Sequence, residues 1–158
     1  MPGPWTPSDS VVGPIVAAIA SRVATQIPAV GHVYEELPDR SPTDNEVVVP
    51  LLRGRHGVQP NQNRGGGDTS GKFEITYTFS LRHVFRRREI DQNLKTAYTY
   101  IQPWLNFFSA LPNQSLGGLT RTLNVTNLTI TQASMAGQPM VVLAVEFDAL
   151  TEFNISYT

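Results

Sequence analysis

An apolar stripe between Glu89 and Leu111 is the clearest pattern of hydrophobic and polar positions in the chain. Its members follow one another at steps of three or four residues, which is the spacing of one face of an α-helix. They are Ile90, Leu94, Ala97, Ile101, Leu105, Phe108 and Leu111. A stripe of this period usually marks burial, so it predicts a core helix packed on a sheet, with Leu105 and Phe108 inside the core.

Two prolines set limits to this helix. Pro103 lies inside the stripe and removes the hydrogen bond to the carbonyl of Thr99, which predicts a kink. Pro112 predicts the end of the helix, because it interrupts the backbone hydrogen bonds once more. The polar segment that follows, residues 113–119, contains two adjacent glycines and predicts a turn that leads into a strand.

A second apolar stripe with the same spacing predicts a helix over residues 10–26. Ser10 is a suitable N-cap, and Pro14 is tolerated because the N–H groups of the first turn have no partner inside a helix. Pro28 predicts the end of this helix. The stripe consists of Val12, Val16, Ile19, Val23 and Ile27.

Strict alternation of apolar and polar residues predicts three long strands. The first covers residues 72–85, and the second begins at Leu119 and changes phase near residues 126–127, which predicts a β-bulge. A hairpin turn at residues 136–139 leads into the third strand, residues 141–155. The apolar face of the first strand consists of Phe73, Ile75, Tyr77, Phe79, Leu81 and Phe85.

These elements together predict the fold class. Two shorter strands are expected at residues 30–37 and 45–52. Strands with one apolar face need a cover, which the two helices supply, so we predict an α+β fold with a mostly antiparallel β-sheet and two α-helices packed on one face. Residues 1–10 are rich in proline and predict an extended N-terminal arm. Residues 11–158 are expected to form a single domain.

Residues 53–71 break the pattern within this predicted domain. They contain six glycines and have no apolar period. A connection of this length without secondary structure is uncommon inside a compact domain and is usually disordered or functional. The segment therefore predicts a long flexible loop.

Composition excludes several classes of protein. The net charge of −1 gives no long-range attraction to nucleic acids or membranes, so any such affinity has to be local. The absence of cysteine excludes disulfides, thiolate metal sites and a cysteine nucleophile. A basic region followed by an apolar run is missing at the start, and no segment has the length of a membrane span. We therefore expect a protein made in a cytoplasm that makes no membrane contact.

No constellation of residues indicates catalysis. The segment from Gly66 to Lys72 is similar to a phosphate-binding loop, but Phe73 occupies the position of the magnesium-binding hydroxyl, and a strand follows in place of a helix. The three histidines lie too far apart for metal spacing, and Glu146 and Asp148 are better explained as an exposed face of a strand. We therefore expect no enzymatic activity, no cofactor and no bound metal.

The basic residues are the feature with the clearest functional meaning. They form a cluster that consists of Arg82, His83, Arg86, Arg87 and Arg88, and the loop at residues 53–71 adds three more arginines. Contact with nucleic acid, salt bridges between subunits and a merely solvated turn are three interpretations that the sequence leaves open. We select six candidate interface or channel residues, namely Arg53, Arg55, Arg64, Arg86, Arg87 and Arg88.

The order of elements resembles the tail terminator, or tail completion, proteins of tailed bacteriophages. The likeness covers residues 11–157 and is carried by four segments followed by the final long hairpin. These segments are Ile15–Ile19 in the N-terminal helix, Val47–Pro50, the aromatic strand Tyr77–Leu81, and Leu111–Pro112 followed by Ser115–Gly118. The long, glycine-rich segment at residues 53–71 departs from the resemblance.

The resemblance implies a structural virion protein of the phage neck. Such proteins form a ring, usually of six subunits, that caps the tail tube and joins it to the head-side connector or stopper protein, with passing contact to DNA in the channel. The resemblance supplies no catalytic residues. The alternative function is a small nucleic-acid-binding domain that uses the cluster Arg82–Arg88. Exposed aromatic residues would favour this alternative, but Phe73, Tyr77 and Phe79 share the apolar face of their strand, so we expect them in the core.

Overall fold

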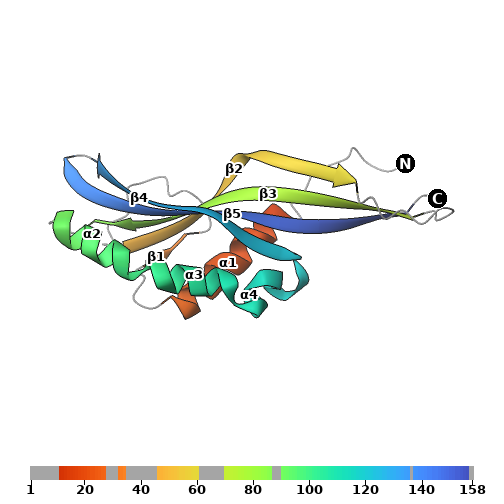
Figure 1. Ribbon diagram of the computed structural model, residues 1–158, viewed down its shortest axis with the longest axis horizontal. Helices are drawn as coiled ribbons and strands as arrows, with labels where there is room; N and C mark the ends of the chain where they lie inside the picture. The colour runs from red at the N-terminus through yellow and green to blue at the C-terminus, as the bar shows by residue number, and fades with distance from the viewer. Residues whose placement is uncertain are drawn as a thin grey trace, which may run out of the picture.

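The computed structural model of the protein describes residues 11–27, 32–34, 46–60, 70–86, 90–135 and 137–156. The predicted N-terminal arm, residues 1–10, lies outside these ranges. A five-stranded sheet with the order β1-β2-β3-β5-β4 runs through the molecule (Figure 1). Its strands are β1 (His32–Val33), β2 (Glu46–Pro60), β3 (Ser70–Phe85), β4 (Thr122–Met135) and β5 (Gln138–Ser156).

Antiparallel pairing dominates the sheet. Only the two-residue strand β1 runs parallel to its neighbour β2, and β2–β3, β3–β5 and β5–β4 are all antiparallel. The helices all lie on one side of the sheet, below it in Figure 1. They are α1 (Val12–Gln26), α2 (Ile90–Thr99), α3 (Ile101–Ser109), α4 (Leu111–Ser115) and the 3₁₀ turn η1 (Leu116–Gly118). The predicted α+β class is confirmed.

The second predicted helix is broken into α2, α3 and α4. Tyr100 separates α2 from α3, and Pro103 lies in the first turn of α3, where the missing N–H is least costly. Ala110 is extended, with φ −67° and ψ 127°, and separates α3 from α4. Pro112 does not end the helix as predicted, because it lies in the first turn of α4. The predicted turn at residues 113–119 is therefore wrong for residues 113–115, which are helical.

The buried face of α3 differs from the predicted stripe. Phe108 is buried as expected, but the side chain predicted beside it, Leu105, is 37% exposed. Trp104 and Phe107 occupy the core in its place, at 0% and 3% exposure. An aromatic side chain buries roughly 150–250 Å², more than a leucine, so the orientation that buries three aromatic rings is preferred.

The core lies between these helices and one face of the sheet. From the sheet it receives Phe79, Leu81, Phe85, Leu123, Val141, Leu143, Val145, Phe147 and Ala149. From α1 it receives Ile15, Ile19 and Val23, each completely buried. Phe147 stacks on Phe79 with ring centroids 5.3 Å apart and meets Phe108 at 4.6 Å, so α3 contacts the centre of the sheet through aromatic rings.

The strand irregularities follow the sequence closely. The register between β4 and β5 shifts between Val125 and Asn127, so Thr126 is the extra residue of the predicted bulge. Met135 pairs with Gln138, which confirms the predicted hairpin turn. Gly137 has φ +77° in this turn, a conformation that residues with a Cβ rarely adopt.

The prediction of a loop over residues 53–71 is wrong at both of its ends. Residues 53–60 belong to β2, and residues 70–71 belong to β3, while residues 61–69 lie outside the described ranges. Residues 56–60 pair with β3, although the register shifts between Leu52 and His56. Backbone hydrogen bonds to a neighbouring strand hold a segment in a sheet without any apolar alternation, which is why the sequence did not indicate this strand.

The hairpin turn gives a first testable prediction. Replacing Gly137 by alanine should lower the free energy of unfolding by about 1 kcal/mol, because the new Cβ strains a backbone with positive φ. No atom lies within 4 Å of the added Cβ, so the effect comes from the backbone and not from a clash. Urea denaturation measures it, with Ser134→Ala at an exposed position of β4 as the control, for which we expect a change within about 0.5 kcal/mol.

Candidate interaction surfaces

The predicted basic site is only partly described by the structure. Arg53 and Arg55 belong to β2 and lie at the register shift between Leu52 and His56. Arg86 follows the end of β3. The other three candidates, Arg64, Arg87 and Arg88, lie outside the described ranges. The three candidate arginines that the structure describes therefore come from two neighbouring strands, β2 and the end of β3.

Arg86 is not a freely solvated cation. Its side chain is half-buried. Its Nη2 donates at 3.4 Å to Oε1 of Gln138, which is the first residue of β5. Its Nη1 is buried and has no hydrogen-bond partner in the described part of the chain. The guanidinium therefore connects the end of β3 to the β4–β5 hairpin, which restricts its reach toward a partner.

The cluster Arg82–Arg88 is divided by the alternation of the strand. Arg82 is exposed, but His83, which the prediction counted among the basic residues, is completely buried on the opposite face. His83 Nδ1 accepts a hydrogen bond from Trp104 Nε1 at 3.2 Å, and its ring lies 4.2 Å from Phe85 and 4.6 Å from Tyr100. An indole nitrogen only donates, so His83 accepts as a neutral imidazole and is part of the core.

The face of the sheet that points away from the helices is mainly polar, and we call it the open face. It consists of the even-numbered side chains of β3 and β5 and the side chains of β4 that pair with them. Thr78 Oγ1 donates to Asp148 Oδ1 across β3 and β5 at 2.9 Å. The described side chains at its centre are Thr76, Thr78, Ser80, Glu146 and Asp148. Ser80 is buried and the other four are half-buried, so Glu146 and Asp148 share one strand face as predicted but are less exposed than expected.

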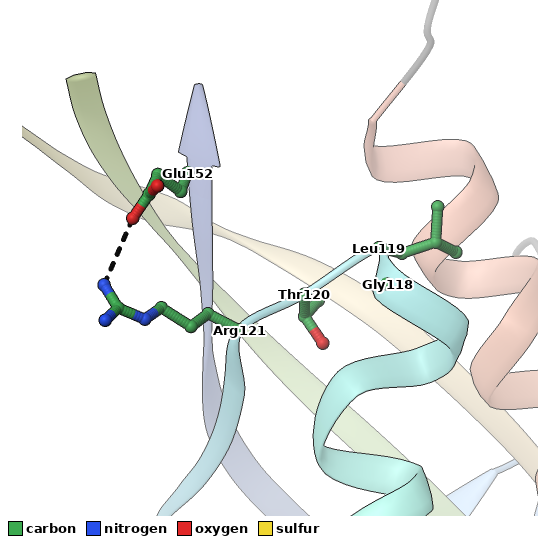
Figure 2. A pocket seen from close by; sticks show the side chains of 5 residues that line it. All are labelled: Gly118, Leu119, Thr120, Arg121 and Glu152. Atoms are coloured by element: carbon green, nitrogen blue, oxygen red, sulfur yellow. Dashed lines mark hydrogen bonds and ion pairs between the residues drawn. The ribbon is translucent and has the colours of Figure 1, made fainter. Parts of the chain in front are cut away.

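Arg121 links two strands at one end of the open face. Its Nη1 lies 3.1 Å from Glu74 Oε1 and 3.1 Å from Glu152 Oε2, and these two glutamates pair directly across β3 and β5. Figure 2 shows Arg121 reaching from the segment before β4 to Glu152, at the rim of a shallow pocket. Gly118, Leu119 and Thr120 complete the pocket. Among the described residues that line it, the one cation, Arg121, is already engaged by two carboxylates, so these residues offer no arrangement for binding an anion.

Replacing Arg121 by an uncharged residue tests how much its two ion pairs contribute to stability. Replacing Arg121 by glutamine should lower the free energy of unfolding by less than about 1 kcal/mol, because the guanidinium is 58% exposed and solvent screens both contacts. The loss should shrink further in about 1 M salt, where the screening length falls to roughly 3 Å. Urea denaturation at low and high salt, with Arg82→Gln as the control, measures both effects.

The outer edge of β4 holds a contact that the sequence did not indicate. Gln114 of α4 donates from Nε2 to the carbonyl of Leu123 at 2.8 Å, and its Oε1 accepts from the N–H of Leu123 at 3.1 Å. Its Nε2 also donates to the carbonyl of Phe108. The amide therefore occupies the hydrogen-bonding groups of Leu123 as a neighbouring strand would. A glutamine in a polar segment gives no sequence signal for this role, since the contact depends on how α4 packs.

Within the described ranges, no three His, Asp or Glu side chains are grouped in a way that could hold a metal ion. None of the helices described combines the length and hydrophobicity that crossing a bilayer requires. No protein-family model matches the chain, and comparison with curated proteins gives no match.

Proposed function

We propose that the protein is a structural subunit of a tailed-bacteriophage neck, where it forms a ring that ends the tail tube and joins it to the head-side connector. The observation that supports this most directly is the polar open face of a long sheet, on the side away from all described helices (Figure 1). A sheet with one packed face and one polar face leaves that second face and its edges available for other subunits.

The length of the strands adds support. β3 has 16 residues and β5 has 19, which corresponds to roughly 50–65 Å at the usual rise per residue. The buried side chains described on β3, Phe79 to Phe85, all lie in its second half. The first half of β3 and the paired end of β5 project beyond α3 and α4 in Figure 1. Extended strands that project beyond the core of their own subunit are suited to contacts between subunits.

The likeness to tail terminator proteins supplies the particular assembly. It rests on the residues of α1, the start of β2, the aromatic centre of β3 and the segment 111–118. In this proposal the partners are further copies of the chain, a tail tube protein and a head-side connector or stopper protein. Arg53, Arg55 and Arg86 would then face a neighbouring subunit or the DNA that passes through the channel.

Electron microscopy of purified protein mixed with isolated tail tubes tests this proposal. We expect rings of uniform diameter, and a fraction of the tubes closed at one end by such a ring. Tubes alone, and tubes mixed with an unrelated protein of similar size, serve as controls. Absence of rings on tube ends at saturating protein would contradict the proposed function.

A further inference from the structure

β1 covers the outer side of β2 only at Val47 and Val48, and we call the outer side of the rest of this strand, residues 49–60, the β2 edge. We propose that the outer edge of β4 pairs with the β2 edge of a second copy of this chain, head to tail, so that the sheets of neighbouring subunits become continuous. This inference rests on the proposed ring and names the surface that builds it. Three independent features lead to it: the outward backbone groups of β4, the distribution of charge, and the relative directions of β4 and β2.

The backbone groups on the outer side of β4 follow from the hydrogen bonds of its inner side. The carbonyl of Glu146 faces β4, because it accepts from Thr126 Oγ1, and Asn127 pairs with Glu146. The backbone groups of Asn127 therefore face β5, and those of the next residue face outward. The alternation continues without a further register shift to the end of the strand. The outward groups belong to Leu128, Ile130, Gln132 and Ser134.

This part of the edge is available to another strand. β4 is the last strand in the sheet order, and no described strand lies beyond it. In the described part of the chain, Gln114 occupies the first outward position, Leu123, and no hydrogen bond occupies the outward groups from Leu128 to Ser134. A row of outward N–H and C=O groups is a template for strand pairing with another chain. Proteins that avoid such pairing place lysine or proline on the edge strand, and residues 122–135 contain neither a charged residue nor a proline.

The depletion of charge extends from this edge over the neighbouring helices. Residues 96–145 contain a single charged residue, Arg121, although the whole chain has 12 Lys and Arg and 13 Asp and Glu. α3 and α4 both contact β4, and Leu111 on α4 is 82% exposed. Tyr98 and Leu119 are also exposed to solvent. Depletion of charged residues together with exposed apolar and aromatic side chains is the composition of a protein–protein interface.

The strands on the two sides of the proposed contact differ in charge. β4 has no charged residue, and its neighbour β5 carries Glu146, Asp148 and Glu152 without any lysine or arginine. β2 carries Arg53 and Arg55 against Glu46. A contact between two β4 edges would bring the acidic strands of both copies together, whereas a contact between β4 and β2 brings acidic and basic strands together.

The directions of the strands also favour a contact between β4 and β2. β2, β3, β5 and β4 are joined by antiparallel pairings, so β4 runs opposite to β2. If neighbouring copies are related by rotation about a ring axis, β4 of one copy lies antiparallel to β2 of the next. Antiparallel pairing is the more stable arrangement per residue. Such a contact uses two different surfaces of each copy, which is what allows a ring to close.

A proline on β4 tests the edge itself. Replacing Gln132 by proline removes an outward N–H and leaves the hydrogen bonds to β5 in place, because proline is tolerated on an edge strand in this position. We expect the wild-type chain to assemble and Gln132→Pro to remain monomeric at the same concentration, measured by light scattering after size exclusion. Gln132→Ala keeps the N–H and should assemble like the wild type. Thermal melting of both variants verifies that they fold.

Mixing two variants tests the head-to-tail relation. Gln132→Pro keeps its β2 edge, and the double variant Arg53→Glu, Arg55→Glu keeps its β4 edge. Each should remain monomeric alone, and an equimolar mixture should form one-to-one dimers and nothing larger, because only one functional contact exists between them. If the arginine variant fails to fold, a single Thr129→Cys in the otherwise cysteine-free chain replaces it. A disulfide dimer of that variant would mean that two β4 edges meet, which would overturn the inference.

The outcomes separate this inference from the proposed function. Rings that form equally well with Gln132→Pro would show that another surface builds the assembly, and the inference would be wrong while the ring function stood. A wild-type chain that stays monomeric at about 1 mM, where even a contact of roughly 4 kcal/mol would be half-populated, would also overturn it. The tail-tube experiment would still decide the proposed function by itself.

Discussion

Replacing Trp104 by alanine should lower the free energy of unfolding by about 3–5 kcal/mol. The indole is completely buried between β3 and α3, and its ring lies 5.8 Å from both Phe107 and His83. The truncation therefore leaves a large cavity whose aromatic walls cannot collapse without moving α3 away from the sheet. Urea denaturation measures the loss, and an unchanged slope against urea concentration would show that only stability has changed.

The neighbouring residue provides a matched control. Leu105→Ala should cost less than about 1 kcal/mol, because this side chain is 37% exposed and much of its surface stays in water. Trp104→Phe should have an intermediate effect of roughly 1–3 kcal/mol, since it keeps most of the ring but removes the N–H that His83 Nδ1 accepts. Equal losses for Leu105→Ala and Trp104→Ala would contradict the orientation of α3 described here.

The residues of this cluster show what the sequence could and could not predict. Alternation and the change of phase at residues 126–127 predicted β3, β4, β5 and the bulge, because these features depend on local spacing. The same alternation places His83 on the apolar side of β3, but its basic character led to its assignment to a surface cluster. Only the meeting of β3 with Trp104 across 21 positions reveals a buried imidazole.

The helical segment illustrates the same limit. The stripe of three- and four-residue steps predicted a helix and a kink near Pro103, and both are present. It did not determine which of two adjacent faces of α3 is buried, because Trp104, Leu105 and Phe108 are all apolar and lie within one turn. The choice depends on the space above Phe79 and Phe147 in the sheet, and spacing along the chain carries no information about that space.

The strands of the candidate interface were predictable only in part. β4 was predicted as a strand, but its place at the edge depends on the pairing order, which no local pattern specifies. β2 beyond Leu52 was not predicted at all, because glycines and arginines replace the apolar alternation there. The candidate arginines at positions 53 and 55 therefore lie on strand β2 and not in the predicted loop, which changes how they would meet a partner.

Asn113 holds together the part of the molecule that supports the β4 edge. It is 1% exposed, and its Nδ2 donates to the carbonyl of Phe107 at 2.8 Å and to Gln26 Oε1 at 2.7 Å. Its Oδ1 accepts from Arg22 Nη1 at 3.1 Å and from Gln26 Nε2 at 3.2 Å. Both side-chain partners belong to α1, so this single amide joins α4 to the end of α1.

Removing this amide should be costly. Asn113→Ala leaves the Phe107 carbonyl without this partner and removes the hydrogen bonds to Arg22 and Gln26, so we expect a loss of about 2–3 kcal/mol in the free energy of unfolding. Asn106→Ala is the matched control, because Asn106 is an exposed residue of α3 whose side chain accepts a hydrogen bond from the exposed Gln102. We expect that control to stay within about 0.5 kcal/mol of the wild type.

The same substitution should also loosen the start of the β4 edge. Asn113 and Gln114 are adjacent in α4, and the first connects this helix to α1 while the second binds the backbone of Leu123. If Asn113→Ala frees α4 from α1, Gln114 Oε1 no longer stays in place as the acceptor of the Leu123 N–H. This N–H should then exchange with solvent at least about tenfold faster, which corresponds to a loss of roughly 1.4 kcal/mol of local protection. Hydrogen exchange followed by mass spectrometry on the peptide that contains Leu123 measures this, and the peptides of β3 serve as an internal reference. Unchanged exchange at Leu123 in a destabilised Asn113→Ala variant would mean that Gln114 is positioned by η1 and α3 alone, and that α1 has no part in shaping the edge.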